Sequence, residues 1–239
     1  MQDSTALNRC LAFVNCQVRP PAWPSPVIGE PPRLRAVTIS RQTGCGALAV
    51  ADQLARLLQQ RYPSSAPPWT VFDRNLMEKV LEDHHLPARL AKLLPEDRIT
   101  EVQDIIDELF GLHPPSWILI QQTSETILHL AELGNVILIG RGANVVTARL
   151  PGVIHVRLVA PTARRIQRCH DDGTMNLREA GKFVAREDLG RRRYLKKYFK
   201  SDIDDPLLYH LVLNIGRISF DEAARIVADA GLMLAGSRR

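Results

Sequence analysis

Short apolar runs separated by stretches with helical spacing occur along most of this chain, and this alternation limits its possible folds more than any other feature. Val136–Gly140 is continuously apolar, which is typical of a strand covered on both faces of a sheet. Short buried strands that alternate with helices predict an α/β fold with a parallel sheet. The expected strands are Ala36–Ser40, Trp69–Phe72, Val136–Gly140, Val153–Val159 and Leu211–Asn214.

Helix signals lie between and after these strands. Ser219 and Glu222 have the spacing of a capping box, in which each residue hydrogen-bonds the other's backbone at the start of a helix. Asn176 and Glu179 form a similar pair ahead of a helix expected at about 177–186. Ligands of parallel sheets bind where the carboxyl ends of strands meet helix N-termini. The residues that follow each strand are therefore the candidates for a binding site.

The chain is expected to form one folded domain with a leader and an insert. Residues 1–33 contain six prolines and no amphipathic period, so they are expected to be a flexible leader. The folded domain then covers residues 34–239. Residues 74–133 have four helical patterns separated by prolines and are expected to form a helical insert. The four helices are expected at about 74–83, 87–94, 98–110 and 116–133.

Composition excludes several classes of protein. Apolar residues make up 45% of the chain and charged residues 24%, so it can bury a sizeable core and is not disordered throughout. It has no run of 18 or more apolar residues and no signal-peptide pattern, so no membrane partner is expected. The four cysteines lack metal-ligand spacing and are expected to be reduced thiols of a cytoplasmic protein.

The positive charge of the chain is concentrated in one segment. The formal net charge is +5, yet residues 157–200 hold 13 Lys and Arg against 5 Asp and Glu, whereas the rest holds 18 against 21. Such clustering predicts a partner rich in phosphate. Within it, helical spacing places Arg186, Arg193 and Lys197 on one side of residues 186–200, as a nucleic-acid-binding helix would. A solvated basic face is the other interpretation.

A glycine turn, Thr43–Gly46, joins the first expected strand to the first long helix. Glycines let backbone N–H groups point inward, and the helix dipole adds positive potential, so a phosphate would be bound here. On the template G-x-x-x-x-G-K-[ST], however, Arg41 occupies the first glycine position, Ala47 the lysine position and Leu48 the hydroxyl position. The motif alone is therefore weak, and a tight turn without a ligand is the alternative.

The same turn also fits a dinucleotide-binding fingerprint. Gly44, Gly46 and Ala49 match G-x-G-x-x-A, and Asp73 could bind a ribose, as in an NAD(P)-dependent oxidoreductase. Asp73 lies 29 residues past Gly44 instead of the usual ~20. Because no Tyr-x-x-x-Lys pair or comparable hydride-transfer site is present either, this class of enzyme is the weaker alternative.

Charged residues end two other expected strands. Asp73 and Arg74 close the second strand, and Arg141 lies between Gly140 and Gly142 at the end of the third. An arginine between two glycines is held beside exposed backbone, so its side chain can reach into the crevice at the strand ends. The alternative for Arg141 is an ion pair with a nearby carboxylate.

Six segments in order resemble the cytidylate kinase-like family, a branch of the P-loop nucleoside monophosphate kinases. The resemblance spans residues 34–230, and the order of the segments is more specific than any one of them. It implies a five-stranded parallel sheet with helices on both faces, a helical nucleotide-binding insert and a basic lid at about 162–205. The segments are ISRQTGCG, FDRNLM, NVILIGRGANVV, HVRLVAP, REDLGRRRYLKKYF and DPLLYHLVLNIGRISFDEA.

The resemblance also implies an activity and a set of site residues. The activity is transfer of the ATP γ-phosphate to a nucleoside monophosphate such as CMP or dCMP, with Mg²⁺ as the second cofactor and no direct side-chain motif for a metal. The residues implied for the nucleotide phosphates are Thr43, Gly44, Cys45 and Gly46. Those implied for the acceptor are Asp73, Arg74 and Arg141, although the family role of the first two is not assigned. Those implied for catalysis are Arg186, Asp188 and Arg191.

The chain departs from the cytidylate kinases proper at Ala47, where they carry a lysine. Relatives in this branch often lack that lysine too. The departure leaves an inactive nucleotide sensor as an alternative to an active kinase, and a nucleic-acid-binding regulatory protein as a further one. Our hypothesis is that Arg41 replaces the missing cation in catalysis. The expected partners are ATP and a nucleoside monophosphate, nucleic acid is not expected, and the insert could form a homodimer contact.

Overall fold

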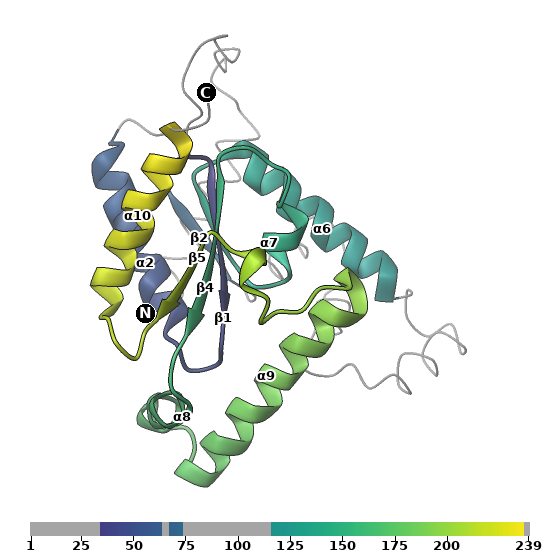
Figure 1. Ribbon diagram of the computed structural model, residues 1–239, viewed down its shortest axis with the longest axis vertical. Coiled ribbons are helices and arrows are strands. Elements are labelled where there is room, and N and C mark those ends of the chain that lie inside the picture. The colour runs from purple at the N-terminus through teal and green to yellow at the C-terminus, as the bar shows by residue number, and fades with distance from the viewer. Residues whose placement is uncertain (1–33, 64–66, 74–115, 237–239) are drawn as a thin grey trace.

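The computed structural model describes residues 34–63, 67–73 and 116–236. In this part of the chain, five parallel strands form one sheet in the order β2-β3-β1-β4-β5 (Figure 1). The predicted fold class and the five predicted strands are confirmed, each strand end within one residue. The strands are β1 (Ala36–Arg41), β2 (Thr70–Phe72), β3 (Val136–Ile139), β4 (Val153–Val159) and β5 (Leu211–Asn214).

Helices cover both faces of the sheet. Helices α2 (Ala47–Arg61) and α10 (Phe220–Gly236) pack on each other and on one face, and α6 (Ser116–Leu133) and α7 (Ala143–Val146) lie on the other (Figure 1). Successive side chains of a strand point to opposite faces. Both faces are buried here, which explains the continuous apolar runs: Ile137 and Ile139 lie in the core beneath α2, and Val136 and Leu138 in the core beneath α6.

Two further helices, α8 (Thr162–Asp171) and α9 (Leu177–Phe199), stand beyond the carboxyl end of the sheet, after β4 (Figure 1). The capping box of Asn176 and Glu179 is confirmed, but the helix it starts does not end near residue 186. The whole helix is 23 residues long, and it ends at Phe199, where Lys200 adopts a left-handed conformation, φ 54°. The basic segment continues the helix because its Arg, Lys and Leu residues are good helix formers.

The remaining predictions on helices have two outcomes. The helix predicted at 116–133 is confirmed as α6, and the capping box of Ser219 and Glu222 is confirmed at the start of α10, with the Ser219 N–H and the Glu222 Oε2 at 2.8 Å. The leader 1–33 and the three other helices of the insert, at 74–83, 87–94 and 98–110, lie outside the described residues. No helix within the described ranges combines the length and apolar character needed to cross a bilayer.

The strand order bears on the dinucleotide alternative. In the dinucleotide-binding fold the order is 3-2-1-4-5-6, so β1 lies between β2 and β4. Here β1 lies between β3 and β4, and β2 is at the edge. The fingerprint match at the glycine turn therefore occurs in a different sheet topology, which does not support an NAD(P)-dependent oxidoreductase.

Buried His155 in β4 is expected to make the fold less stable in acid. Its side chain is only 6% exposed, and burial, with a contribution from the charge of His210, lowers its pKa to about 4. An unfolded histidine has a pKa near 6.5, so between pH 6.5 and 4 the unfolded state binds a proton that the folded state does not. The free energy of unfolding should therefore fall by about 3 kcal/mol as the pH falls through this window.

Urea unfolding at pH 7 and pH 4.5 measures this effect. The variant His155→Asn, whose amide can still reach Thr38 Oγ1, should show a shallower dependence on pH, whereas replacement of exposed His129 by Asn should leave the dependence as it is. Equal slopes for wild type and His155→Asn would refute the prediction.

Candidate functional site

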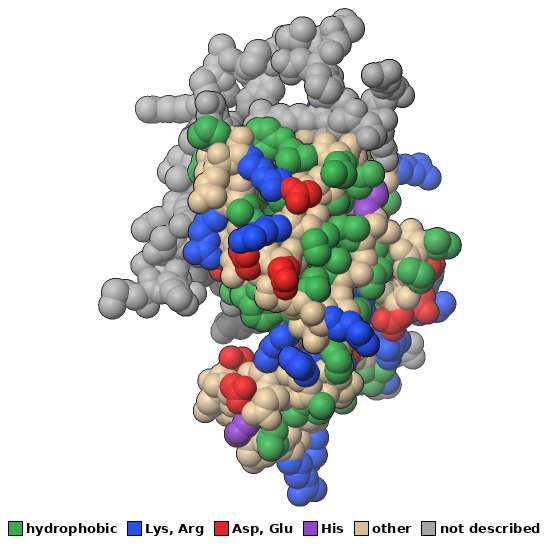
Figure 2. Space-filling model, turned by 60° about the vertical axis from the view of Figure 1, so that its left-hand side comes forward, with side chains coloured by type: hydrophobic (Ala, Val, Ile, Leu, Met, Phe, Trp, Pro, Cys, Tyr) green, Lys and Arg blue, Asp and Glu red, His purple; other side chains and the backbone are tan. Residues whose placement is uncertain are grey.

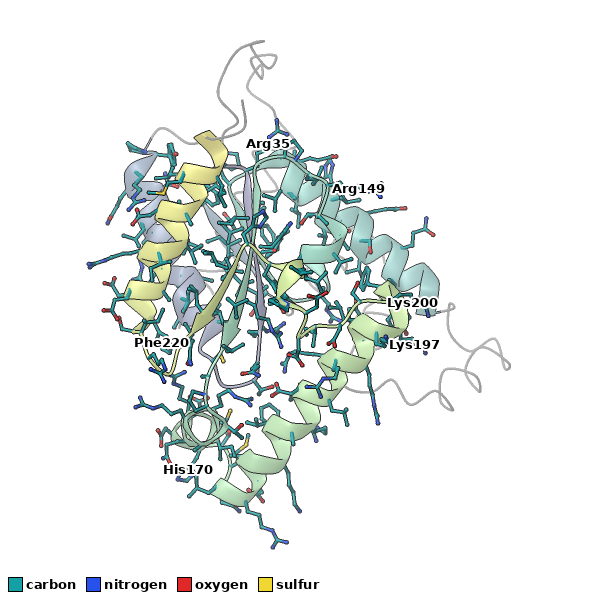
Figure 3. All side chains as sticks on the ribbon, viewed as in Figure 1. Arg35, Arg149, His170, Lys197, Lys200 and Phe220 are labelled. Carbon is teal, nitrogen blue, oxygen red and sulfur yellow. The ribbon has the colours of Figure 1, made fainter. Side chains whose placement is uncertain are left out.

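The glycine turn after β1 is tightly packed between three helices. Gly44 and Gly46 both have left-handed backbone angles, φ 77° and 69°. A Cβ atom on Gly44 would lie 2.5 Å from the carbonyl oxygen of Arg165 in α8. One on Gly46 would lie 2.3 Å from the ring of Phe220, which Figure 3 shows at the end of α10 that is nearer α8. Both positions therefore require glycine for conformation and for space.

A carboxylate from α9 binds the turn. Asp188 Oδ1 accepts hydrogen bonds from the Thr43 backbone N–H at 2.7 Å and from its hydroxyl at 2.8 Å. Its other oxygen, Oδ2, accepts from Arg165 Nη1 at 2.6 Å. Arg191, one turn further along α9, donates from Nη1 to the Thr43 hydroxyl oxygen. The basic helix is thus attached to the glycine turn by charge-assisted hydrogen bonds, and an anion could reach the Thr43 N–H only by replacing Asp188.

Two arginines of α8 bind the carbonyl groups of the same turn. Arg165 Nη1 donates to the Thr43 oxygen at 3.2 Å, and Arg168 Nη1 donates to the Gly44 oxygen at 3.2 Å. The Arg168 guanidinium also lies 4.9 Å from the centre of the Phe220 ring. The sequence analysis missed both residues as part of the site. Their positions just after the fourth strand, three residues apart on one helix face, were the available signal.

Beside the turn, at the carboxyl ends of β1 and β3, is a small hollow, partly open to solvent, that we call the arginine cavity. Three guanidinium-bearing residues from three different elements line it, and none of its described lining residues is acidic. Other Lys and Arg side chains lie on the surface in Figure 2, between the body of the molecule and the helical part below it. The cavity is lined by Ser40, Arg41, Gly140, Arg141, Gly142, Asn144, Arg191, Tyr194, Leu195 and Ile203.

Strand register brings two of these arginines together. β1 and β3 are parallel neighbours in which Ile39 pairs with Ile139. Arg41 and Arg141 each follow two residues later, so they leave the sheet at the same level. Arg141 is only 4% exposed and has φ 54°, and it lies between two glycines of positive φ. This tight turn places Arg141 at the strand ends, where it lines the cavity.

Arg191 belongs to both parts of the site. It lines the arginine cavity and binds the glycine turn through Thr43. Carboxylates one turn back on α9 hold it, with Glu187 Oε2 at 3.7 Å and Asp188 Oδ1 at 3.5 Å. Because α9 contacts the turn and the cavity through Arg191, a shift of the helix would move the Arg191 guanidinium relative to both.

Ser40 is fixed at the edge of the cavity by buried Arg157 of β4. Arg157 donates from Nη1 to Ser40 Oγ at 2.9 Å and from Nη2 to Asp204 Oδ1 at 2.8 Å. Partial burial opposes ionisation of Asp204, but hydrogen bonds and charges from Arg192 and Arg157 outweigh it, so the pKa of Asp204 lies below its usual value. This network connects the segment after α9 to the sheet.

Comparison with models of protein families assigns the chain to a family. A model of the cytidylate kinase-like family matches residues 36–217, which include the sheet, the turn, the arginine cavity and helices α8 and α9. The chain belongs to the cytidylate kinase-like family. The match covers most of the chain and agrees with the resemblance seen in its six sequence segments.

Of three solved structures that are similar to this family member, the first shares its fold. An uncharacterized protein from Eubacterium ventriosum has 17% sequence identity and a TM-score of 0.63, covering 84% of this chain and 99% of its own. Shikimate kinase from Bacteroides thetaiotaomicron has 13% identity, a TM-score of 0.47 and coverage of 82% and 97%. A gluconokinase from Sinorhizobium meliloti has 12% identity, a TM-score of 0.47 and coverage of 85% and 95%. No curated protein sequence matches the chain.

The predicted site residues of this family member fall into three groups. Arg41, Arg141 and Arg191 come together in the arginine cavity, and Thr43, Gly44, Gly46 and Asp188 lie at the adjoining turn. Cys45 also lies in the turn, but its side chain is buried in the core, and burial raises the pKa of the thiol to about 11. Its thiol therefore stays neutral, and its part in phosphate binding can come only from the backbone.

The other predicted residues either do not line the arginine cavity or lie outside the described residues. The Arg186 side chain is 64% exposed, pairs with Glu187 at 3.3 Å and does not line the cavity. Asp73 follows β2 at the edge of the sheet and does not line it either. Arg74 lies outside the described residues.

Proposed function

We propose that the chain is a cytoplasmic phosphotransferase that moves the γ-phosphate of ATP to a nucleoside monophosphate such as CMP or dCMP. The observation that carries the proposal is the convergence of three arginines from separate elements on one cavity beside a glycine turn. Family membership supports the reaction class, and the choice of acceptor base is an inference from the family description. A turn rich in backbone amides beside a cluster of guanidinium groups suits two anionic ligands bound side by side.

In the proposed complex, each side of the site has a role. Arg141 holds the phosphate of the acceptor, because a planar guanidinium can bind two phosphate oxygens at once. Arg41, which lines the same cavity, supplies the positive charge of the missing lysine. The glycine turn faces the phosphates of ATP, and Arg191 lies between the two groups. Phosphoryl transfer needs little covalent help from the protein; it needs alignment and positive charge on the transferring oxygens. The arginines can supply both.

The residues present fit nucleotide phosphates, and they leave Mg²⁺ to be held mainly by the substrate. Within the described ranges, no group of three or more His, Cys, Asp or Glu residues could hold a metal ion. Mg²⁺ in kinases is usually bound by one or two carboxylates together with the substrate's phosphates, and it neutralises charge on the transferring oxygens. Asp188 is the described carboxylate at the turn.

A nucleotide sensor without catalysis is the second candidate, and two observations favour it. Ala47, at the position of the missing lysine, is buried in the core, so the turn itself contributes no side-chain cation. In the structure, the Asp188 carboxylate accepts the hydrogen bond of the Thr43 N–H, which a phosphate at the turn would otherwise accept. Loss of one transition-state donor lowers enzyme rates by about 10²–10³-fold. Turnover, not binding, therefore separates the two candidates.

The purified full chain should transfer phosphate from ATP in the presence of Mg²⁺ to at least one of CMP, dCMP, UMP and AMP. ADP release and thermal shift, measured in parallel, report turnover and binding. Stabilisation by ATP and a monophosphate without ADP release would support the sensor. Transfer only to a hydroxy acid such as shikimate or gluconate, or no stabilisation by any nucleotide, would contradict both candidates.

A further inference from the structure

Asn144 is a buried polar residue in the arginine cavity that neither the sequence analysis nor the proposed function includes. It belongs to α7, directly after the turn that carries Arg141, and is only 5% exposed. Asn144 lines the cavity, and its Nδ2 atom is buried without a hydrogen-bond partner among the described residues. A buried N–H donor without an acceptor is unfavourable and rare in native proteins. Its position in the cavity leaves the acceptor to come from what fills the cavity, a water molecule or a ligand oxygen.

Hydrogen bonds hold the backbone on both sides of Asn144. The position of this residue at the cavity is therefore not due to a loosely held loop. The N–H groups of Ala143 and Val145 donate to Gly140 and Gly142 at 3.0 and 2.8 Å. The Thr147 hydroxyl donates to the Ala143 oxygen at 2.6 Å. Asn135, the residue just before β3, is also buried, but its amide is satisfied within the protein. Its Nδ2 donates to the Pro67 oxygen at 2.7 Å.

We propose that Asn144 is a ligand-binding residue of the arginine cavity and that its Nδ2 donates a hydrogen bond to an oxygen of the acceptor's phosphate. The proposal rests on the proposed function for the identity of the ligand. The chemistry points to phosphate because the amide shares its cavity with Arg41, Arg141 and Arg191, and a phosphate monoester has more oxygens than one arginine fork can bind. A neutral amide adds a donor without adding another like charge to the cluster.

Binding of inorganic phosphate and of CMP to the full-length protein, measured by calorimetry, tests the proposal. Asn144→Asp has nearly the same shape but replaces the donor with a carboxylate that repels phosphate. We expect Asn144→Asp to weaken the binding of both ligands by more than about 10-fold, and Asn144→Ala to weaken it by about 3–10-fold. An effect on CMP alone would mean that Asn144 contacts the base or sugar, and would overturn the assignment to phosphate.

Matched controls separate ligand binding from folding. Asn214→Asp, at the end of β5, keeps the oxygen that accepts the Gly216 N–H at 2.9 Å and should bind phosphate like the wild type. Without ligand, Asn144→Ala should melt at or above the wild-type temperature, because it removes an unsatisfied donor. A marked fall in its melting temperature would show a structural role and would overturn the proposal.

The outcome is distinguishable from that of the proposed function. If the wild type binds phosphate and Asn144→Asp does not, the proposal stands even when no nucleotide is phosphorylated. If the wild type transfers phosphate and Asn144→Asp keeps its affinities and turnover, the proposal fails while the proposed function stands. Failure of the wild type to bind either phosphate or CMP overturns the proposal as well.

Discussion

Replacement of Arg141 by methionine is expected to lower kcat/KM for a nucleoside monophosphate by about 10²–10³-fold, the usual cost of deleting one strong donor to a reacting phosphate. Methionine fills a similar volume but removes the charge and the paired N–H donors. Arg141 is the most buried of the three cavity arginines, and few water molecules can replace it there. Steady-state kinetics with ATP and Mg²⁺ held at saturation measures the effect on the acceptor.

Two further variants make this prediction specific. Arg141→Lys keeps the charge but loses the planar fork, so it should recover only part of the activity. Arg225→Met removes an exposed arginine of α10 that pairs with Asp221 on the same helix, and it should leave the kinetics unchanged. Because Arg141 is buried with a positive φ, circular dichroism must first show that each variant is folded. Activity of folded Arg141→Met within about twofold of wild type would remove Arg141 from the site.

Gly44→Ala should destabilise the protein by about 3 kcal/mol, the combined cost of a left-handed alanine and an overpacked contact. The added Cβ would meet the backbone carbonyl of Arg165 at 2.5 Å, and backbone cannot move aside as the tip of a side chain can. Either the turn or α8 must shift, which would also strain the bonds from Arg165 to Thr43 and Asp188. Urea unfolding measures the loss.

Gly173→Ala is the matched control for this effect. Gly173 has nearly the same φ, 75°, but a Cβ there would meet nothing within 4 Å. It should therefore show only the conformational cost, about 1–2 kcal/mol. The difference between the two variants isolates the close approach of α8 to the glycine turn. Equal losses would mean that the turn and α8 are not packed as described.

The sequence predicted the sheet well because its signals are local. Val136–Ile139 is buried on both faces, and a run of apolar residues without alternation is the direct consequence. Val153–Val159 is equally buried, although His155 and Arg157 interrupt its apolar residues. The capping boxes at Asn176 and Ser219 were equally visible, because each involves residues three positions apart. The length of α9 was less visible, since a charged segment with good helix formers has no marked end in its apolar pattern.

The site was predicted only in part. Arg41 and Arg141 could be placed together because both follow strands of one parallel sheet, whose carboxyl ends meet at one edge. The bond between Thr43 and Asp188 joins residues 145 positions apart and depends on where α9 crosses the turn. Arg165 and Arg168 were hidden in the same way among the 13 basic residues of one segment.

The sequence by itself therefore determined the parallel sheet, its main helices and the strand ends that carry the candidate site. Tertiary structure alone decided that Asp188 occupies the turn, that Arg186 faces solvent and that Asn144 is a buried donor in the cavity. The reason is physical. Periodicity and capping depend on neighbours within a few residues, whereas hydrogen-bond satisfaction and burial depend on how helices far apart in the sequence pack together.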